Sequence, residues 1–292
     1  MTRTTAKPLQ PLKGVRILSL ALNLPGPAAL MRCLQMGAKC LKLEPPNGDP
    51  MAHYSQAAYD HLHQGIQLLK ADLKTDTGQK ILHRELAKAD VLITSFRPSA
   101  NEKLGLNWKK LHRLYPALSQ IAIFGSPGAR ADEPGHDLTY QADSGLVHGL
   151  TLPATLYADM GGSLMTTEAV LQATLSQRLK GKGVFLEIAL SNATDYLALP
   201  RQWGLTLPDG WVGGAHAGYQ VQPCKDGRVA IAALEPHFAA ALCAEIGLPA
   251  SDIGTMLKPA TRQAIADFLL TRTRAELDQL AAEKDIPLHT MA

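Results

Sequence analysis

The stretch "GVRILSLALNLPGPAALMRCLQMGAKCLKLEPP", residues 14–46, decides the fold. Its apolar run at 14–22 is typical of a buried β-strand, and residues 26–37 carry apolar side chains at helical spacing. A second apolar run at 38–46 predicts another strand, which ends at two prolines. Because the connections are short, the stretch predicts two parallel strands joined by a right-handed helical crossover.

The same alternation continues along the first half of the chain. It predicts helices over 75–89 and 107–116 and strands over 90–96 and 118–126. Alternating strands and helices are typical of a doubly wound, Rossmann-like α/β sheet. Ligands of such sheets bind at the carboxyl ends of the strands.

The second half begins in the same way and then changes in texture. A helix over 159–180, a strand over 184–190 and a helical segment over 191–200 are followed by a Gly-, Pro- and Trp-rich stretch at 205–218. That stretch indicates a linker or a loop that lines a cleft. Beyond it the pattern predicts a β-hairpin over 219–234 with its turn at 225–227, and helices over 235–248, 259–270 and 273–284. We therefore expect a large α/β domain at 1–204 and a smaller α+β domain at 205–292.

Composition excludes several classes of protein. The 292 residues carry a net charge of +3, with Lys and Arg scattered rather than clustered, so we expect no nucleic-acid partner. A mildly positive balance suits a small anionic ligand such as a phosphate-bearing cofactor. The four cysteines form no C-x-x-C pair, so no metal site is indicated. There is no run of about 20 apolar residues and no secretory signal, so we expect a cytoplasmic protein without a membrane span.

Acid–base candidates occur where strands or loops meet helices. His136 lies in "PGHDLTYQ" (134–141), Asp159 precedes Gly161 and Gly162 at an expected helix start, and Glu235 opens a helix at Glu-Pro. Each also has an ordinary structural interpretation. His136 can be a solvated loop residue, Asp159 a helix N-cap and Glu235 a partner of the helix dipole. Asp137, next to His136, can be a turn-forming residue.

A series of segments, in order along the chain, resembles one enzyme family. They are "LKGVRILSLALNLPGP", "MGAKCLKLEPPNGDP", "ADLKTDTGQKIL", "ADVLITSFRPSANEKLGL", "PGHDLTYQADSG", "YADMGGS", "GKGVFLEIAL", "GYQVQPCKDGRVAIAALEPHF" and "FLLTRTRAELDQL". From about Leu12 to about Ala282 the chain resembles the family III CoA-transferases (the CaiB/BaiF group), and within them most closely the α-methylacyl-CoA racemases. The resemblance implies that coenzyme A enters as part of the substrate, with no separately bound cofactor.

The resemblance also implies roles for the candidate residues. Asp159 matches the transferases' nucleophile, which forms an acyl anhydride, and also a base of the racemases. The racemases' Gly-His-Asp and Glu-Pro-x-Phe motifs match residues 135–137 and 235–238. His136 and Asp159 would then face opposite sides of the substrate α-carbon, and Glu235 would orient His136. The backbone N–H near Asp137 would stabilise the enolate oxygen.

These residue types suit a 1,1-proton transfer. One base removes the α-proton of a thioester, and a conjugate acid on the opposite face returns a proton. Histidine titrates near neutrality, and burial raises the proton affinity of a carboxylate. For CoA itself, the resemblance implies contacts from Lys42 and Arg97, with Lys70 or Lys74 as substitutes for missing cations. We expect Gly161 and Gly162 to let the ligand approach the backbone closely.

Three departures from the family pattern keep alternatives open. The family's basic cluster, Asn-Arg-x-Lys-Arg, reads here as neutral residues 63–67, and the stretch 145–159 is several residues shorter than expected. The chain also stops before the segment by which family members return to the first domain, so we expect a homodimer that need not interlock. The prediction is an acyl-CoA racemase or epimerase. The alternatives are a CoA-transferase, or a shortened non-catalytic paralogue or partner subunit.

Overall fold

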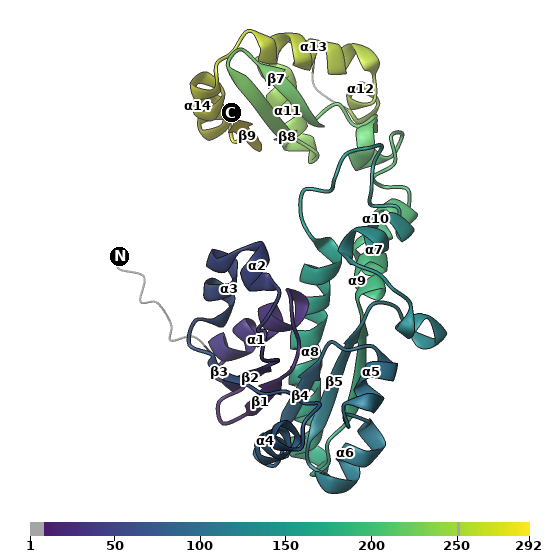
Figure 1. The fold of residues 1–292 in the computed structure, drawn as a ribbon. Coiled ribbons are helices and arrows are strands. Elements are labelled where there is room, and N and C mark those ends of the chain that lie inside the picture. Colours follow the sequence, from purple (N-terminus) through teal and green to yellow (C-terminus); the bar gives the residue numbers. More distant parts are fainter. Residues whose placement is uncertain (1–8, 250–251) are drawn as a thin grey trace, which may run out of the picture. The chain divides into compact units, whose positions relative to one another are not determined.

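The fold is that of a computed structural model in which residues 9–249 and 252–292 are described. The chain forms two compact units, Met1–Ala198 and Leu199–Ala292 (Figure 1). The predicted boundary after residue 204 lies just beyond α10 (Leu199–Gln202), which belongs to the second unit.

A six-stranded, fully parallel sheet forms the centre of the first unit, in the order β3-β2-β1-β4-β5-β6. The chain starts in the middle of the sheet, winds outward to β3, and returns to the other side at β4, as in a Rossmann fold. The predicted doubly wound sheet is therefore confirmed. The strands are β1 (Arg16–Ser19), β2 (Lys39–Glu44), β3 (Gln67–Lys70), β4 (Val91–Thr94), β5 (Ser119–Phe124) and β6 (Phe185–Ala189).

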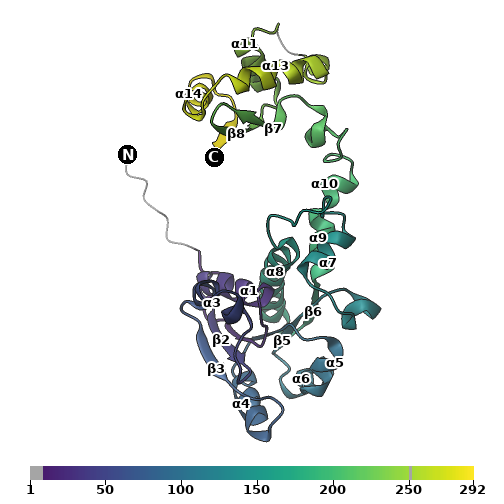
Figure 2. The same ribbon diagram turned by 45° about the horizontal axis from the view of Figure 1, so that its top comes forward.

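Helices cover both faces of this sheet (Figures 1 and 2). Alternate strand residues point to opposite faces, so Ile17 packs in the core beside α1 and α8, whereas Leu18 packs with residues of α4 and α6. The long helix α8 crosses the first face and contacts α1, β5 and β6. The helices of this unit are α1 (Pro25–Gln35), α2 (Met51–Tyr54), α3 (Gln56–His63), α4 (Asp76–Leu86), α5 (Pro98–Lys103), α6 (Trp108–Leu114), α7 (Asp137–Asp143), α8 (Tyr157–Lys180) and α9 (Leu190–Leu197), with a 3-10 turn at Gly128–Asp132.

The second unit is built on a three-stranded antiparallel sheet in the order β7-β8-β9. The predicted hairpin is present as β7 (Tyr219–Cys224) and β8 (Gly227–Ala232), and β9 (Leu288–Met291) adds a strand that the sequence pattern did not indicate. Its helices pack on the face that carries the buried Val229 and Ile231. They are α11 (Pro236–Glu245), α12 (Ile253–Met256), α13 (Pro259–Leu270) and α14 (Arg274–Lys284), and a π-helical turn lies at Trp211–Ala215.

Across 9–249 and 252–292, none of the helices combines the length and the apolar character that crossing a bilayer requires.

Candidate active site

A cavity of about 620 Å³ lies at the carboxyl edge of the first unit's sheet. Its walls come from the loops after β1 and β4, the end of β5, helix α7 and the first turn of α8. Because β1 and β4 lead away from each other in chain order, their loops separate and leave a crevice between them. Its walls include Leu22, Asn23, Leu24, Pro25, Arg97, Phe124, Gly125, His136, Asp137, Tyr140 and Asp159.

His136 begins α7 with its side chain exposed at this cavity. Its backbone N–H donates to the Thr139 hydroxyl at 3.1 Å, and the Thr139 N–H donates to the His136 carbonyl at 2.9 Å. These bonds fix the backbone of the Gly-His-Asp motif and leave the imidazole without a protein partner among the described residues.

Asp137 connects the two helices that carry the candidate acid–base groups. The residue is 6% exposed, and its carboxylate accepts the backbone N–H of Asp159 at 3.0 Å. The Gln141 amide donates to the other carboxylate oxygen, and also to the Thr155 carbonyl at 3.2 Å. The acidic side chain thus satisfies a free N–H in the first turn of α8. It ties that turn to α7 rather than forming a local turn.

Asp159 is the third residue of α8, whose N-cap is Leu156. The expectation that the helix starts at Asp159 was therefore wrong by two residues. The carboxyl is half-buried in the cavity wall, where burial, and then the negative charge of Asp137, raise its pKa to about 7. At neutral pH it can both hold and release a proton.

Gly161 and Gly162 have a different role from the one the sequence indicated. A β-carbon at Gly162 would overlap the Leu190 side chain, and one at Gly161 would lie 3.1 Å from Ala193 Cβ. Both glycines therefore allow α8 to pack closely on α9. Their Cβ side faces a neighbouring helix instead of a ligand.

Arg97 and Lys74 lie where an anionic ligand could reach them. Arg97 is exposed and lines the 620 Å³ cavity. Lys74, also exposed, lines a smaller cavity of about 190 Å³ after β2 and β3. Leu22 belongs to the walls of both cavities, so they adjoin along the carboxyl edge of the sheet.

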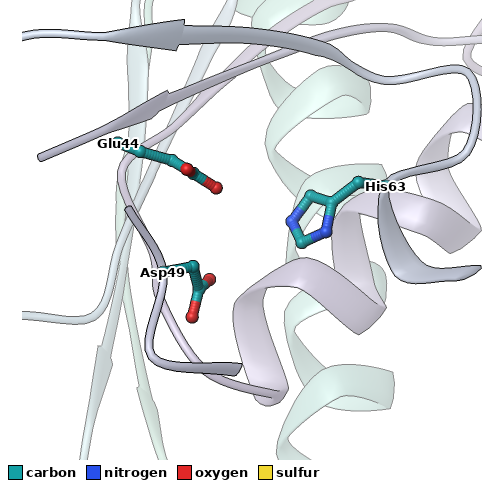
Figure 3. Close-up of side chains that lie close together, drawn as sticks. All are labelled: Glu44, Asp49 and His63. Carbon is teal, nitrogen blue, oxygen red and sulfur yellow. The ribbon is translucent and has the colours of Figure 1, made fainter. Parts of the chain in front are cut away.

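Lys42 is not in such a position. It is completely buried, and its ammonium contacts the Asp49 carboxylate, Glu44 Oε1 at 3.1 Å and His63 Nε2 at 2.8 Å. Figure 3 shows the side chains of Glu44, Asp49 and His63 lying close together. Each offers one potential metal-ligand atom, and these atoms lie within 4.8 Å of one another. We expected this ammonium to meet CoA phosphates. In the structure the ammonium is instead bound inside the protein by Glu44, Asp49 and His63, three groups that could otherwise hold a metal ion.

The hydrogen bonds of this Lys42 cluster determine the state of His63. Its Nδ1 lies 2.6 Å from the Tyr59 carbonyl, so Nδ1–H donates there and Nε2 accepts from Lys42. Burial, and then the charge of Lys42, lower the pKa of His63 and keep it neutral. The Tyr59 hydroxyl donates to Glu44 at 3.0 Å and completes the cluster. Within the neutral segment 63–67, Ile66 is 8% exposed and belongs to the apolar core.

Glu235 belongs to the second unit, where it is the exposed N-cap of α11 and makes no side-chain cap bond. The structure of the first unit thus brings His136, Asp137 and Asp159 together, and the pairing of Glu235 with His136 stays a prediction. The second unit has its own larger cavity, about 670 Å³, lined by residues such as Tyr219, Arg262 and His289. It contains none of the predicted site residues.

Comparison with known proteins matches this architecture to one family. Residues 12–292 match the family described as CoA-transferase family III. The chain belongs to this family. Two crystal structures share the fold: a hypothetical protein from Mycobacterium tuberculosis (TM-score 0.83, 24% identity, 98% of this chain and 86% of that one) and a CaiB/BaiF family protein from Brucella suis (TM-score 0.80, 22% identity, 98% and 85%).

Curated relatives in the family are enzymes of two kinds. An alpha-methylacyl-CoA racemase from Mus musculus is 28% identical over 291 residues, covering 92% of this chain and 74% of its own length. An acetyl-CoA:oxalate CoA-transferase from Acetobacter aceti is also 28% identical, over 275 residues, covering 85% and 70%. Membership therefore places the chain among the racemases and CoA-transferases of family III without separating the two.

Proposed function

We propose that this protein is an acyl-CoA racemase or epimerase that moves a proton at the α-carbon of a 2-methylacyl-CoA thioester. The observation that carries the proposal is the shared cavity of His136 and Asp159, in which Asp159 has a pKa of about 7. A carboxyl group with this proton affinity is suited to exchange protons at neutral pH.

In the proposed reaction the His136 imidazole takes the α-proton, and the electron pair moves toward the thioester oxygen as an enolate. Protonated Asp159 then delivers a proton to the opposite face of the α-carbon. The turnover leaves His136 protonated and Asp159 ionised, which is the state that accepts the opposite enantiomer. Asp137 holds the Asp159 backbone in place, and its own backbone N–H is one proposed donor to the enolate oxygen.

CoA recognition in this proposal runs along the carboxyl edge of the sheet. Arg97 lies in the wall of the acyl cavity and Lys74 in the wall of the adjoining smaller one. Both are exposed cations that can meet phosphates. Lys42 acts indirectly, because its buried ammonium holds Asp49, and Asp49 accepts the backbone N–H groups of Asn23 and Met51 at 2.9 Å each.

CoA transfer is the second candidate, supported by the transferases among the relatives. Asp159 would attack the thioester carbonyl, release CoA thiolate and carry the acyl group as an anhydride. A nucleophilic carboxylate must be ionised, and a pKa of about 7 leaves much of Asp159 protonated at neutral pH. This favours the proton carrier over the nucleophile.

Proton exchange in heavy water tests the proposal. The protein is incubated with a 2-methylacyl-CoA, and deuterium at the α-carbon is followed by mass spectrometry beside His136→Ala and Asp159→Ala. Incorporation by the wild type that both variants lose supports the racemase. No incorporation, together with a hydroxylamine-sensitive acyl group on the peptide that contains Asp159, supports the transferase. Failure of CoA to bind at millimolar concentration supports a non-catalytic family member or partner subunit.

A further inference from the structure

Tyr140 lies in the same cavity as His136 and Asp159 but has not entered the chemistry so far. It is on α7, one turn after His136, and the residue is 8% exposed. It belongs to the cavity wall together with both candidate acid–base groups. A buried phenol in such a place calls for an explanation, because its hydroxyl loses water and needs a partner.

Two glycines from separate segments make room for the Tyr140 hydroxyl. Gly125 follows β5, and Gly135 precedes His136. At either position a β-carbon would overlap the phenol oxygen of Tyr140. The Gly of the Gly-His-Asp motif is therefore required by the tyrosine five residues later, and the ring is held against backbone on two sides.

The hydroxyl itself has no protein partner among the described residues. Several buried polar atoms of the chain have no partner and no solvent access, but the Tyr140 hydroxyl is not one of these atoms. It therefore retains some exposed surface, and Tyr140 lines the cavity. Burial, and then the negative charge of Asp159, raise the pKa of Tyr140, which keeps the phenol protonated at neutral pH. The cavity thus contains a neutral, immobilised donor whose hydrogen is not used by the protein.

We propose that the Tyr140 hydroxyl donates a hydrogen bond to the carbonyl oxygen of the bound thioester and to the enolate oxygen formed from it. This inference rests on the proposed acyl-CoA chemistry and adds a side-chain donor to the Asp137 backbone N–H. No bond to the tyrosine forms or breaks. As charge develops on the oxygen, the donor stabilises it without having to reorient, since the two glycines fix the ring.

Tyr140→Phe tests this inference because it keeps the ring and removes only the hydroxyl. The control is Tyr196→Phe, which removes the hydroxyl of a tyrosine on α9 that is 71% exposed. We expect Tyr140→Phe to slow α-proton exchange about 100-fold while its melting temperature stays with that of the control. The limb of the pH–rate profile near pH 7 should remain, because Tyr140 carries no proton to or from the substrate.

Two binding measurements separate a donor from a packing residue. Tyr140→Phe should weaken binding of the 2-methylacyl-CoA thioester and leave unchanged the binding of an S-alkyl-CoA thioether, which has no carbonyl oxygen. The infrared carbonyl band of the bound, ¹³C-labelled thioester should move to higher wavenumber in Tyr140→Phe than in the wild type. Equal loss of affinity for thioester and thioether, or an unmoved carbonyl band, overturns the inference.

The outcomes also separate this inference from the proposed function. Exchange by the wild type that is equally fast in Tyr140→Phe overturns the role of Tyr140 and leaves the racemase standing. A wild type that binds the thioester without exchanging its α-proton overturns the racemase, and a carbonyl band that moves in Tyr140→Phe still supports the donor. A wild type that binds no thioester overturns both.

Discussion

Two groups of ionisable residues lie at the same edge of one sheet, and they are in opposite states. In the Lys42 cluster, the ammonium, two carboxylates and a neutral imidazole satisfy one another inside the protein. In the cavity, the His136 imidazole and the Tyr140 hydroxyl have no protein partner among the described residues, and burial raises the pKa of Asp159 to about 7. Both groups lie toward the carboxyl edge of the same parallel sheet, so position in the fold does not separate them. What separates them is whether the protein itself completes the hydrogen bonds.

The difference teaches where chemistry can occur. A charge that is fully paired and buried is expensive to disturb and contributes to the framework. A group with a shifted pKa and no partner is available to a ligand. By this criterion Lys42, which the sequence suggested as a ligand residue, belongs to the framework of the site, and Asp159 is the group that the proposed reaction would use.

We expect the largest effect from a substitution in the cavity group of His136, Tyr140 and Asp159. Asp159→Asn keeps the shape of the side chain and removes its proton chemistry, so we expect α-proton exchange to fall by about 10²–10⁴-fold. Asp143→Asn is the control, because Asp143 is an exposed residue of α7 that pairs with Arg130 only at the surface. Equal rates in Asp159→Asn and wild type would remove Asp159 from the reaction.

The same variant has a predicted effect on stability. The pKa of Asp159 is raised in the folded state, so its contribution to stability is present below the unfolded pKa near 4 and lost as pH rises through about 7. Asp159→Asn should therefore gain in melting temperature relative to the wild type between pH 5 and pH 8, measured across that range. A constant difference at all these pH values would contradict the shift.

A substitution in the Lys42 cluster should instead lower the stability of the fold. Lys42→Met leaves Glu44 and Asp49 buried without their cation, and removing one partner of a buried pair costs about 3–5 kcal/mol. In a unit of this size we expect the melting temperature to fall by roughly 10 °C. Lys39→Met, at the exposed start of the same strand, is the control. A Lys42→Met protein as stable as that control would show that the cluster is not a structural unit.

A smaller change at Asp137 separates two of its effects on Asp159, the hydrogen bond to the backbone N–H and the negative charge. Asp137→Asn keeps an oxygen for the Asp159 N–H and removes the charge that helps raise the Asp159 pKa. The pH–rate limb near pH 7 should move to lower pH. Asp143→Asn should leave it in place, and a limb that does not move in Asp137→Asn would assign the raised pKa to burial alone.

We expect the smallest effect from a substitution that removes one hydrogen bond from the Lys42 cluster. Tyr59→Phe deletes the hydroxyl that donates to Glu44, a loss of about 0.5–1.5 kcal/mol in the free energy of unfolding. Tyr54→Phe is the control, because Tyr54 is 74% exposed. Urea denaturation should rank wild type and Tyr54→Phe together, with Tyr59→Phe below them and still above Lys42→Met.

Much of the fold follows from local pattern. Apolar runs such as 118–126 and the helical spacing of 26–37 mark buried strands and amphipathic helices, and each strand that was expected is present. The edge strand β3 was missed because Gln67–Lys70 is largely exposed and short, and β9 because four residues give too little alternation. Their formation depends on neighbours distant in sequence.

The candidate site was less accessible to sequence reasoning. His136 and Asp159 were found from motifs, but burial decided the others. The sequence does not reveal that Lys42 is enclosed by residues up to His63, or that Gly162 faces Leu190. A glycine and a tyrosine in one motif, Gly135 and Tyr140, hint at close packing. The sequence does not show that Gly125 packs on the same tyrosine, because that contact is visible only in the structure.

The two tethers across the segment between α7 and α8 have a consequence for how this site can diversify. Asp137 holds the Asp159 N–H, and Gln141 holds the Thr155 carbonyl, so the chain from 144 to 154 is an excursion that leaves and returns at fixed points. Closing a longer excursion costs little extra entropy. Insertions and deletions there can change the length of this segment while His136 and Asp159 keep their places in the cavity wall, so the loop can vary without moving the candidate acid–base groups.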